Sequence, residues 1–209
     1  MPTIDEIVAH ISSDLEAKNE ARDRALADSR QIIRHAANTI RALHRNEFGA
    51  AAGHLQSGRA MVDATRSALR EYPDLYWTGY VQDAQKELAE AYLVEAMIQE
   101  QALPDPAVIG VEAAPYLNGM AEAASEMRRY VLDMVRHGGP ERMTAAERVL
   151  RLMDDVYSNL ITVDFPDAVT GGLRRTTDQL RAVLERTRGD LTVTMRQAEL
   201  ERALARAHD

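Results

Sequence analysis

The 209-residue sequence contains no cysteine, almost no lysine and no long apolar run. The absence of cysteine excludes disulfides, thiolate zinc sites, iron–sulfur clusters and a cysteine nucleophile, and it fits a reducing compartment, so we expect a cytoplasmic protein. No apolar run approaches the ~20 residues that span a bilayer, and no secretory leader is recognisable. We therefore expect no membrane partner.

Several familiar catalytic motifs are also missing. The sequence has no GxxxxGK[ST] or GxGxxG loop for phosphates and no GxSxG nucleophile elbow. Its six histidines are scattered, and none follows a glutamate by three residues, which excludes the Glu-x-x-His pairs of carboxylate-bridged di-iron bundles. Carboxylates and arginines remain as the candidates for chemistry.

Charge is distributed unevenly along the chain. The net charge is −8, and the only lysines are Lys18 and Lys86. Residues 83–126 contain nine acidic residues and one basic residue, so this window accounts for the whole net charge. An acidic segment beside arginine-rich ones suits a protein that holds cations in one place and anions in another. The alternative is an ordinary solvated acidic face.

Apolar residues recur at helical spacing from end to end, without two-residue alternation or a long linker. This pattern predicts an all-α protein, with residues 1–209 forming a single domain of about seven helices. Thr3 and Glu6 form a capping box for the first helix, which meets no glycine or proline before Phe48. That helix would be ~68 Å long, against ~45 Å for a globule of this size. Either it bends near residues 16–23, or one end projects and finds a partner chain, and we favour an oligomer.

Breaker residues divide the rest of the chain. We expect a second helix over about 50–70 and a third from Pro73 to about Ala102. A fourth runs from Pro115 to Gly138, and a fifth begins at Thr144 and ends near Ile161. Gly189, as a C-terminal cap, separates a sixth helix from a seventh.

Two pairs of glutamates stand out in the acidic window. Glu87 and Glu90 are spaced i, i+3 beside an apolar surface, and Glu122 and Glu126 are spaced i, i+4 on a face rich in small residues. Four carboxylates brought together would repel, and a hard cation removes that conflict. Mg²⁺, or Mn²⁺ in its place, takes oxygen ligands and activates water for attack on a phosphodiester. The alternative is plain solvated surface, particularly for the second pair, which lies off the apolar stripe of its own helix.

Arginines gather on the first and sixth predicted helices. Their planar guanidinium groups suit phosphate, and the alternative is pairing with acidic neighbours on the same helix. Aromatic residues near the start of the third helix, Trp77 among them, can stack on bases or pack in the core. The candidate phosphate-binding residues are Arg30, Arg34, Arg41, Arg45, Arg174 and Arg175.

Short motifs follow one another in a fixed order, namely Asp28-Ser-Arg-Gln, Leu43-His-Arg45, Lys86–Ala91 and Tyr116–Glu126. Together they resemble the translin/Trax family over about residues 20–190. Asp28-Ser-Arg-Gln and the Leu43-His-Arg45 ending resemble the first long helix of that family. Lys86-Glu-Leu-Ala-Glu-Ala91 resembles the Trax motif E-F-V-E-A. Tyr116–Glu126 resembles the Trax segment with an acid followed four residues later by Glu, and the turn at Asp164-Phe-Pro-Asp fits in position.

The resemblance implies both a fold and an activity. The implied fold has about seven helices and assembles into a barrel-like homo-octamer around single-stranded RNA or DNA. The Trax-like, prokaryotic-type branch implies a Mg²⁺-dependent endoribonuclease acting on single-stranded RNA. A translin-like protein that binds single-stranded RNA or DNA without cleaving it is the second hypothesis, and a helical scaffold that touches no nucleic acid is the third.

Carried over by position, the resemblance makes four glutamates both catalytic and metal-binding. Glu87 and Glu90 match the two Glu of the Trax motif, and Glu126 falls on the later Glu. Glu122 falls where the family has Asp, which lengthens that ligand by one methylene. Translin carries a cluster of basic residues before the third helix. In this sequence the corresponding segment is Tyr72–Gly79, which has one acidic residue and no basic residue. The arginines of the first and sixth helices must therefore contribute more to nucleic-acid binding.

Overall fold

The computed structural model describes residues 1–208, and within that range all regular structure is helical. The predicted all-α class is confirmed. Six long helices and three single-turn helices take the place of the seven expected. They are α1 (Ile4–His44), α2 (Phe48–Ala68), α3 (Pro73–Tyr76), α4 (Gly79–Ile98), α5 (Pro106–Ile109), α6 (Ala113–His137), α7 (Pro140–Leu160), α8 (Asp167–Thr170) and α9 (Leu173–His208).

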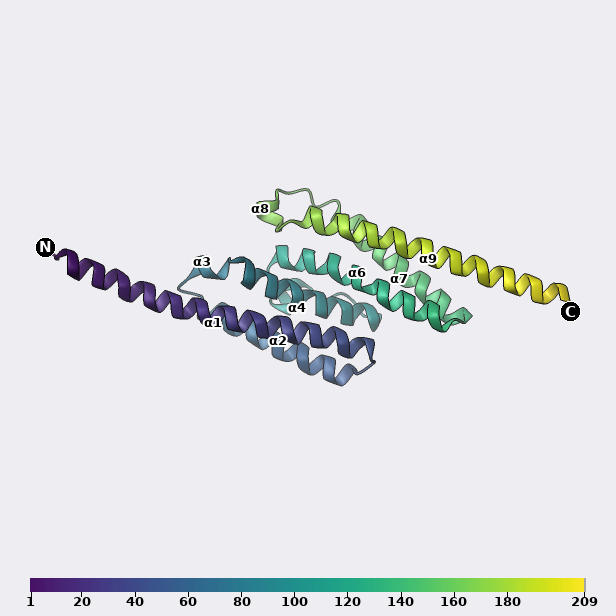
Figure 1. Cartoon of the computed structure of the whole chain (residues 1–209), viewed down its shortest axis with the longest axis horizontal. Coiled ribbons are helices and arrows are strands. Elements are labelled where there is room, and N and C mark those ends of the chain that lie inside the picture. The colour runs from purple at the N-terminus through teal and green to yellow at the C-terminus, as the bar shows by residue number, and fades with distance from the viewer. Residues whose placement is uncertain (209) are drawn as a thin grey trace.

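Helix α1 is one uninterrupted rod. Its predicted capping box is present: the Thr3 hydroxyl accepts from the Glu6 backbone N–H, and the Glu6 carboxylate accepts from the Thr3 N–H. The helix does not end within the polar stretch at 16–23, so of the two expected outcomes the structure has the projecting end (Figure 1). Apart from the half-buried Lys18, the side chains of residues 1–20 are exposed, and buried positions begin at Ala21.

Three predicted helix boundaries are wrong. The expected fifth helix begins at Pro140, as α7, and not at Thr144, whose hydroxyl donates to the Pro140 carbonyl within the helix. Gly189 does not end a helix, because α9 continues through it to His208. Leu184 and Leu191 are buried on either side of Gly189, and Arg128 on α6 bonds to both Thr187 and Asp190. This packing outweighs the ~1 kcal/mol that glycine costs inside a helix. The predicted third helix is interrupted at Thr78, whose extended backbone separates α3 from α4.

The helices form a bundle in which α4 and α6 lie in the middle. Helix α1 packs on α2 and α4, α4 packs on α6, and α6 packs on α7 and α9 (Figure 1). Core side chains such as Leu43, Leu88, Met127, Met153 and Leu180 form one continuous cluster through these layers. Because neighbours cover α4 and α6 on more than one side, acidic side chains between these two helices are partly shielded from solvent.

Helices α4 and α6 approach each other closely at Gly119. A Cβ atom there would lie 2.7 Å from the Lys86 carbonyl oxygen and 3.0 Å from the Glu90 nitrogen. Only a residue without a side chain fits this crossing. The small residues expected to admit another backbone therefore do so, and they bring the two glutamate-bearing helices together. No helix among residues 1–208 combines the length and the apolarity needed to cross a membrane.

Candidate functional site

Three of the four predicted glutamates meet between α4 and α6. Glu87 and Glu90 project from α4 and Glu122 from α6, and each offers a carboxylate oxygen within 4.8 Å of the others. The i, i+3 spacing turns the first two toward α6, and the crossing at Gly119 brings Glu122 to them. We call these three residues the acidic cluster.

Glu90 is the most enclosed member of the acidic cluster. Within the described chain its carboxylate has no hydrogen-bond or ion-pair partner. Burial is the largest cause, and together with the charges of Glu87, Glu122 and Glu126 it raises the pKa of Glu90 to about 8, against an opposing effect of Lys86. Without a cation, Glu90 therefore binds a proton at neutral pH.

Lys86 supplies a counter-charge to the other two carboxylates. Its Nζ atom lies 2.8 Å from the Glu122 carboxylate and 3.2 Å from Glu87 Oε1, and its side chain is 19% exposed. Burial opposes the charged form of Lys86, but the bond and charge of Glu122, with those of Glu87, outweigh it and raise the pKa of Lys86. Burial likewise raises the pKa of Glu122, while Lys86 opposes that rise.

Glu126 lies outside the acidic cluster and is held by a histidine. The Nε2 atom of His44 is 2.6 Å from Glu126 Oε1, and the His44 side chain is 3% exposed. The Nδ1 atom of His44 is buried without a partner among the described residues. An ionised carboxylate can only accept a hydrogen bond, so the Nε2 atom of His44 carries a proton and donates to Glu126.

Two residues of this site, His44 and Lys86, were not predicted as functional. His44 lies in the Leu-His-Arg ending of the first helix, and that motif is the sequence signal from which it could have been identified. Lys86 is the single base in the acidic window, and its position beside Glu87 was the available signal. Neither signal states which carboxylate each residue contacts.

Two adjoining cavities open beside these side chains. The smaller, of about 300 Å³, is lined by Glu90, Glu122 and Glu126 together with residues of α9. The larger, of about 880 Å³, also reaches Glu122 and extends past Lys86 to Trp77 and Arg175. Glu122, Thr176 and Gln179 line both cavities, so the two cavities adjoin at Glu122 of the acidic cluster.

The six predicted arginines are exposed but do not share one surface. Arg30, Arg34, Arg41 and Arg45 lie on or at the end of α1, which is separated from α9 by α4 and α6 (Figure 1). Several of the six have local partners: Arg45 pairs with Glu47, Arg41 donates to the Ala37 carbonyl, and Arg174 pairs with Asp164. Of the six, only Arg175 lines a cavity next to the acidic cluster.

No family model matches the chain. An uncharacterized protein of Methanocaldococcus jannaschii is 26% identical over 194 residues, which cover 90% of this chain and 83% of that protein. The crystal structure of AfC3PO is 30% identical, with a TM-score of 0.80, and the match covers 90% of this chain and 96% of that one. AfC3PO in complex with duplex RNA gives 29% identity and the same TM-score and coverage. Apo-NeC3PO, at 17% identity and a TM-score of 0.80, shares the fold over 93% of this chain and 98% of its own.

Proposed function

This chain belongs to the translin/Trax family, in its Trax-like branch, and from that premise we propose that it is a Mg²⁺-dependent endoribonuclease. One observation carries the proposal. Glu87, Glu90 and Glu122 direct carboxylate oxygens to a common point, within 4.8 Å of one another, at a place partly closed to solvent.

The residues at this point suit a hard divalent cation. All three donors are carboxylate oxygens, which Mg²⁺ and Mn²⁺ prefer. Lys86 contacts Glu87 and Glu122, which leaves the carboxylate of Glu90 without a direct ion-pair partner in the described chain. Glu87, Glu90 and Glu122 would hold the ion, with Glu126 beside them on the wall of the smaller cavity.

A bound Mg²⁺ neutralises charge on the phosphate and lowers the pKa of water. The protein's own residues do the positioning. His44 fixes the Glu126 carboxylate by donating to it. Lys86 and Arg175 face the larger cavity and attract the phosphodiester backbone. Glu90, whose pKa is raised to about 8 by burial and the neighbouring carboxylates, would release its proton on taking up the ion.

We propose single-stranded RNA as the substrate, with single-stranded DNA as a second ligand for the same surface. The structure of AfC3PO in complex with duplex RNA supports an RNA ligand for this chain and makes strandedness a direct test. Cleavage of a labelled single strand should exceed cleavage of the same sequence in a blunt duplex. Equal rates would contradict the single-strand preference and leave the nuclease proposal intact.

The nuclease proposal is tested by charge-neutral substitutions at the acidic cluster. Glu87→Gln and Glu122→Gln should each abolish Mg²⁺-dependent cleavage, while RNA binding and oligomer size stay near those of the wild type. Glu95→Gln is the matched control, because Glu95 is a half-buried carboxylate on α4 outside the cluster. Full activity in both cluster variants would reject this site.

The contacts of Lys86 favour a second candidate function. Its ammonium group pairs with two of the three carboxylates, as in a structural ion pair. Such a protein would bind single-stranded RNA or DNA and leave it intact. Incubating labelled RNA with Mg²⁺ and with EDTA separates the two functions, since only the nuclease yields metal-dependent fragments.

We propose that the chain assembles with itself into a barrel-like homo-octamer. The support is α1, whose first turns project from the bundle (Figure 1) and carry an exposed apolar stripe, Ile4, Ile7, Val8, Ile11 and Leu15. Such a stripe marks a surface for another protein. Removing residues 1–17 should lower the number of copies per assembly, obtained from the light-scattering mass divided by the mass of the shortened chain. An unchanged copy number would exclude the stripe from the interface.

A further inference from the structure

We propose that the larger cavity beside the acidic cluster binds one unpaired nucleotide, with its base stacked on Trp77 and its phosphate paired with Arg175. This inference rests on the proposed function, because it names the part of the RNA that the same site receives. The cavity of about 880 Å³ falls within the ~300–1,000 Å³ range of small-molecule sites.

Trp77 presents an aromatic surface to this cavity. It follows α3, its side chain is 61% exposed, and it lines the cavity wall. Tyr76 packs against it edge to face, with ring centroids 5.2 Å apart and an interplanar angle of 82°. An exposed aromatic ring beside a positively charged group is the arrangement on which proteins stack unpaired bases.

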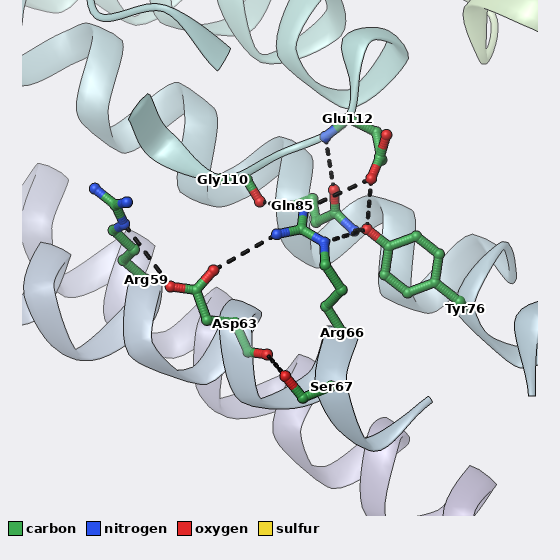
Figure 2. Close-up of polar contacts among 8 residues, drawn as sticks. All are labelled: Arg59, Asp63, Arg66, Ser67, Tyr76, Gln85, Gly110 and Glu112. Carbon is green, nitrogen blue, oxygen red and sulfur yellow. Dashed lines mark hydrogen bonds and ion pairs between the residues drawn. The ribbon is translucent and has the colours of Figure 1, made fainter. Parts of the chain in front are cut away.

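The segment that carries Trp77 is anchored by a polar network. Figure 2 shows the Tyr76 hydroxyl donating to the Glu112 carboxylate at 2.6 Å and accepting from Arg66 and Gln85 at 3.2 Å. Arg66 also donates to the Gly110 carbonyl at 2.6 Å, and Gln85 accepts from the Glu112 N–H at 2.8 Å. The network ties α2, α4 and the start of α6 to Tyr76, so its neighbour Trp77 is positioned before any ligand binds.

Arg175 provides the cationic side of the cavity. Its exposed guanidinium group has no hydrogen-bond or ion-pair partner among residues 1–208, whereas that of the adjacent Arg174 pairs with Asp164 at 3.0 Å. A guanidinium group binds phosphate oxygens with two parallel hydrogen bonds. Gln179, on the same wall, offers an amide to a base edge.

The position of the cavity relates this nucleotide to the scissile bond. Glu122, Thr176 and Gln179 line both this cavity and the smaller one at the acidic cluster. A nucleotide held by Trp77 and Arg175 therefore precedes or follows a phosphodiester at the carboxylates. A base stacked on Trp77 cannot also be paired and stacked within an RNA duplex. The site therefore selects RNA with an unpaired nucleotide next to the cleaved bond.

Binding to Trp77 is directly observable, because it is the only tryptophan in the chain. With EDTA present to prevent cleavage, a short single-stranded oligoribonucleotide should quench tryptophan fluorescence in a saturable way. The same oligomer with abasic sites should bind without quenching. Arg175→Gln should raise the Kd about tenfold, whereas Arg151→Gln, an exposed arginine on α7 away from the cavity, should not change it.

Cleavage gives a second test with matched variants. Trp77→Ala should lower kcat/KM on single-stranded RNA about tenfold, since stacking contributes about that factor per base. Trp77→Phe should retain most of the activity, because it keeps a stacking ring. Phe48→Ala, an exposed aromatic on α2 outside the cavity, should match the wild type.

The outcomes separate this inference from the proposed function. RNA binding without quenching, or wild-type cleavage by Trp77→Ala in a protein that Glu122→Gln inactivates, overturns the nucleotide site and leaves the nuclease intact. The protein could also fail to cleave RNA, while RNA quenches the Trp77 fluorescence and Arg175→Gln binds RNA more weakly than the wild type. That result would support the nucleotide site and reject the nuclease. Absence of any RNA binding rejects both.

Discussion

The Nε2 atom of His44 lies 2.6 Å from the Oε1 atom of Glu126, although 82 positions separate the two residues in the chain. The contact joins the last turn of α1 to the middle of α6. The histidine ring is almost fully enclosed and the carboxylate is half-buried, so the pair is a fixed part of the site. The packing of α1 thus determines where the fourth carboxylate points.

The first prediction concerns this contact. His44→Leu should reduce Mg²⁺-dependent cleavage by about 10- to 100-fold, the usual effect of removing a group that orients a metal-site carboxylate. His44→Gln should recover part of the loss, because its amide nitrogen can replace Nε2 as a donor. RNA affinity should change little, and kcat should fall more than KM rises. If His44 acts through Glu126, adding His44→Leu to Glu126→Gln should cause no further loss.

The raised pKa of Glu90 predicts a pH-dependent stability. The folded protein binds this proton more tightly than the unfolded chain does. The free energy of unfolding of the metal-free protein therefore falls as pH rises from 4.5 to about 8, by at most about 1.4 kcal/mol per pH unit. Glu90→Gln should remove this fall and be more stable than the wild type above pH 8. Urea denaturation in EDTA at several pH values measures both, and the exposed Glu20→Gln should keep the wild-type slope.

Removing the counter-charge of Lys86 should increase the rise in Tm that Mg²⁺ causes. In Lys86→Met, the acidic cluster loses the ammonium group that contacts Glu87 and Glu122. The metal-free variant should melt at a lower temperature than the wild type at pH 8, and Mg²⁺ should raise its Tm by more, because binding to the folded state alone stabilises it. Thermal melts across a Mg²⁺ titration provide the comparison. Equal Mg²⁺ shifts in both proteins would exclude competition between Lys86 and the cation.

The crossing of α4 and α6 predicts opposite effects for two glycine substitutions. Gly119→Ala places a methyl group 2.7 Å from the Lys86 carbonyl oxygen and should cost about 1–3 kcal/mol of stability, together with Mg²⁺-dependent activity. Gly189→Ala meets nothing within 4 Å and should stabilise α9 by about 1 kcal/mol. Chemical denaturation of both variants tests the pair. A stable, active Gly119→Ala would show that the helices can separate without harm to the site.

Local signals in the sequence predicted most of the fold. Apolar spacing identified the long helices, and Thr3 with Glu6 marked the start of α1 as the structure has it. The errors occurred where tertiary contacts override a local signal. Gly189 is a helix terminator by its own preference, but Leu191 and the Arg128 contacts on its far side hold the helix together. No local pattern reports those contacts.

The candidate site was less predictable than the fold. The spacing of Glu87 and Glu90 placed them on one side of a helix, as observed. From the sequence, Glu122 looked unfavourable as a site residue because it lies off the apolar stripe of α6. That argument assumes that the helix has only one buried face. Helix α6 contacts α4, α7 and α9, so Glu122 faces a neighbour rather than open solvent. Which helices become neighbours depends on the topology of the whole bundle. The side-chain pattern of a single helix does not contain that information.

Under the proposed self-assembly, the projecting end of α1 makes part of this protein's secondary structure dependent on its concentration. A helical segment that packs against nothing is marginal in water, and residues 4–17 carry apolar side chains that their own bundle leaves uncovered. Dilution that separates neighbouring copies should therefore fray this segment first. The loss should be visible as a drop in helical circular dichroism while the buried layers of α4 and α6 stay folded.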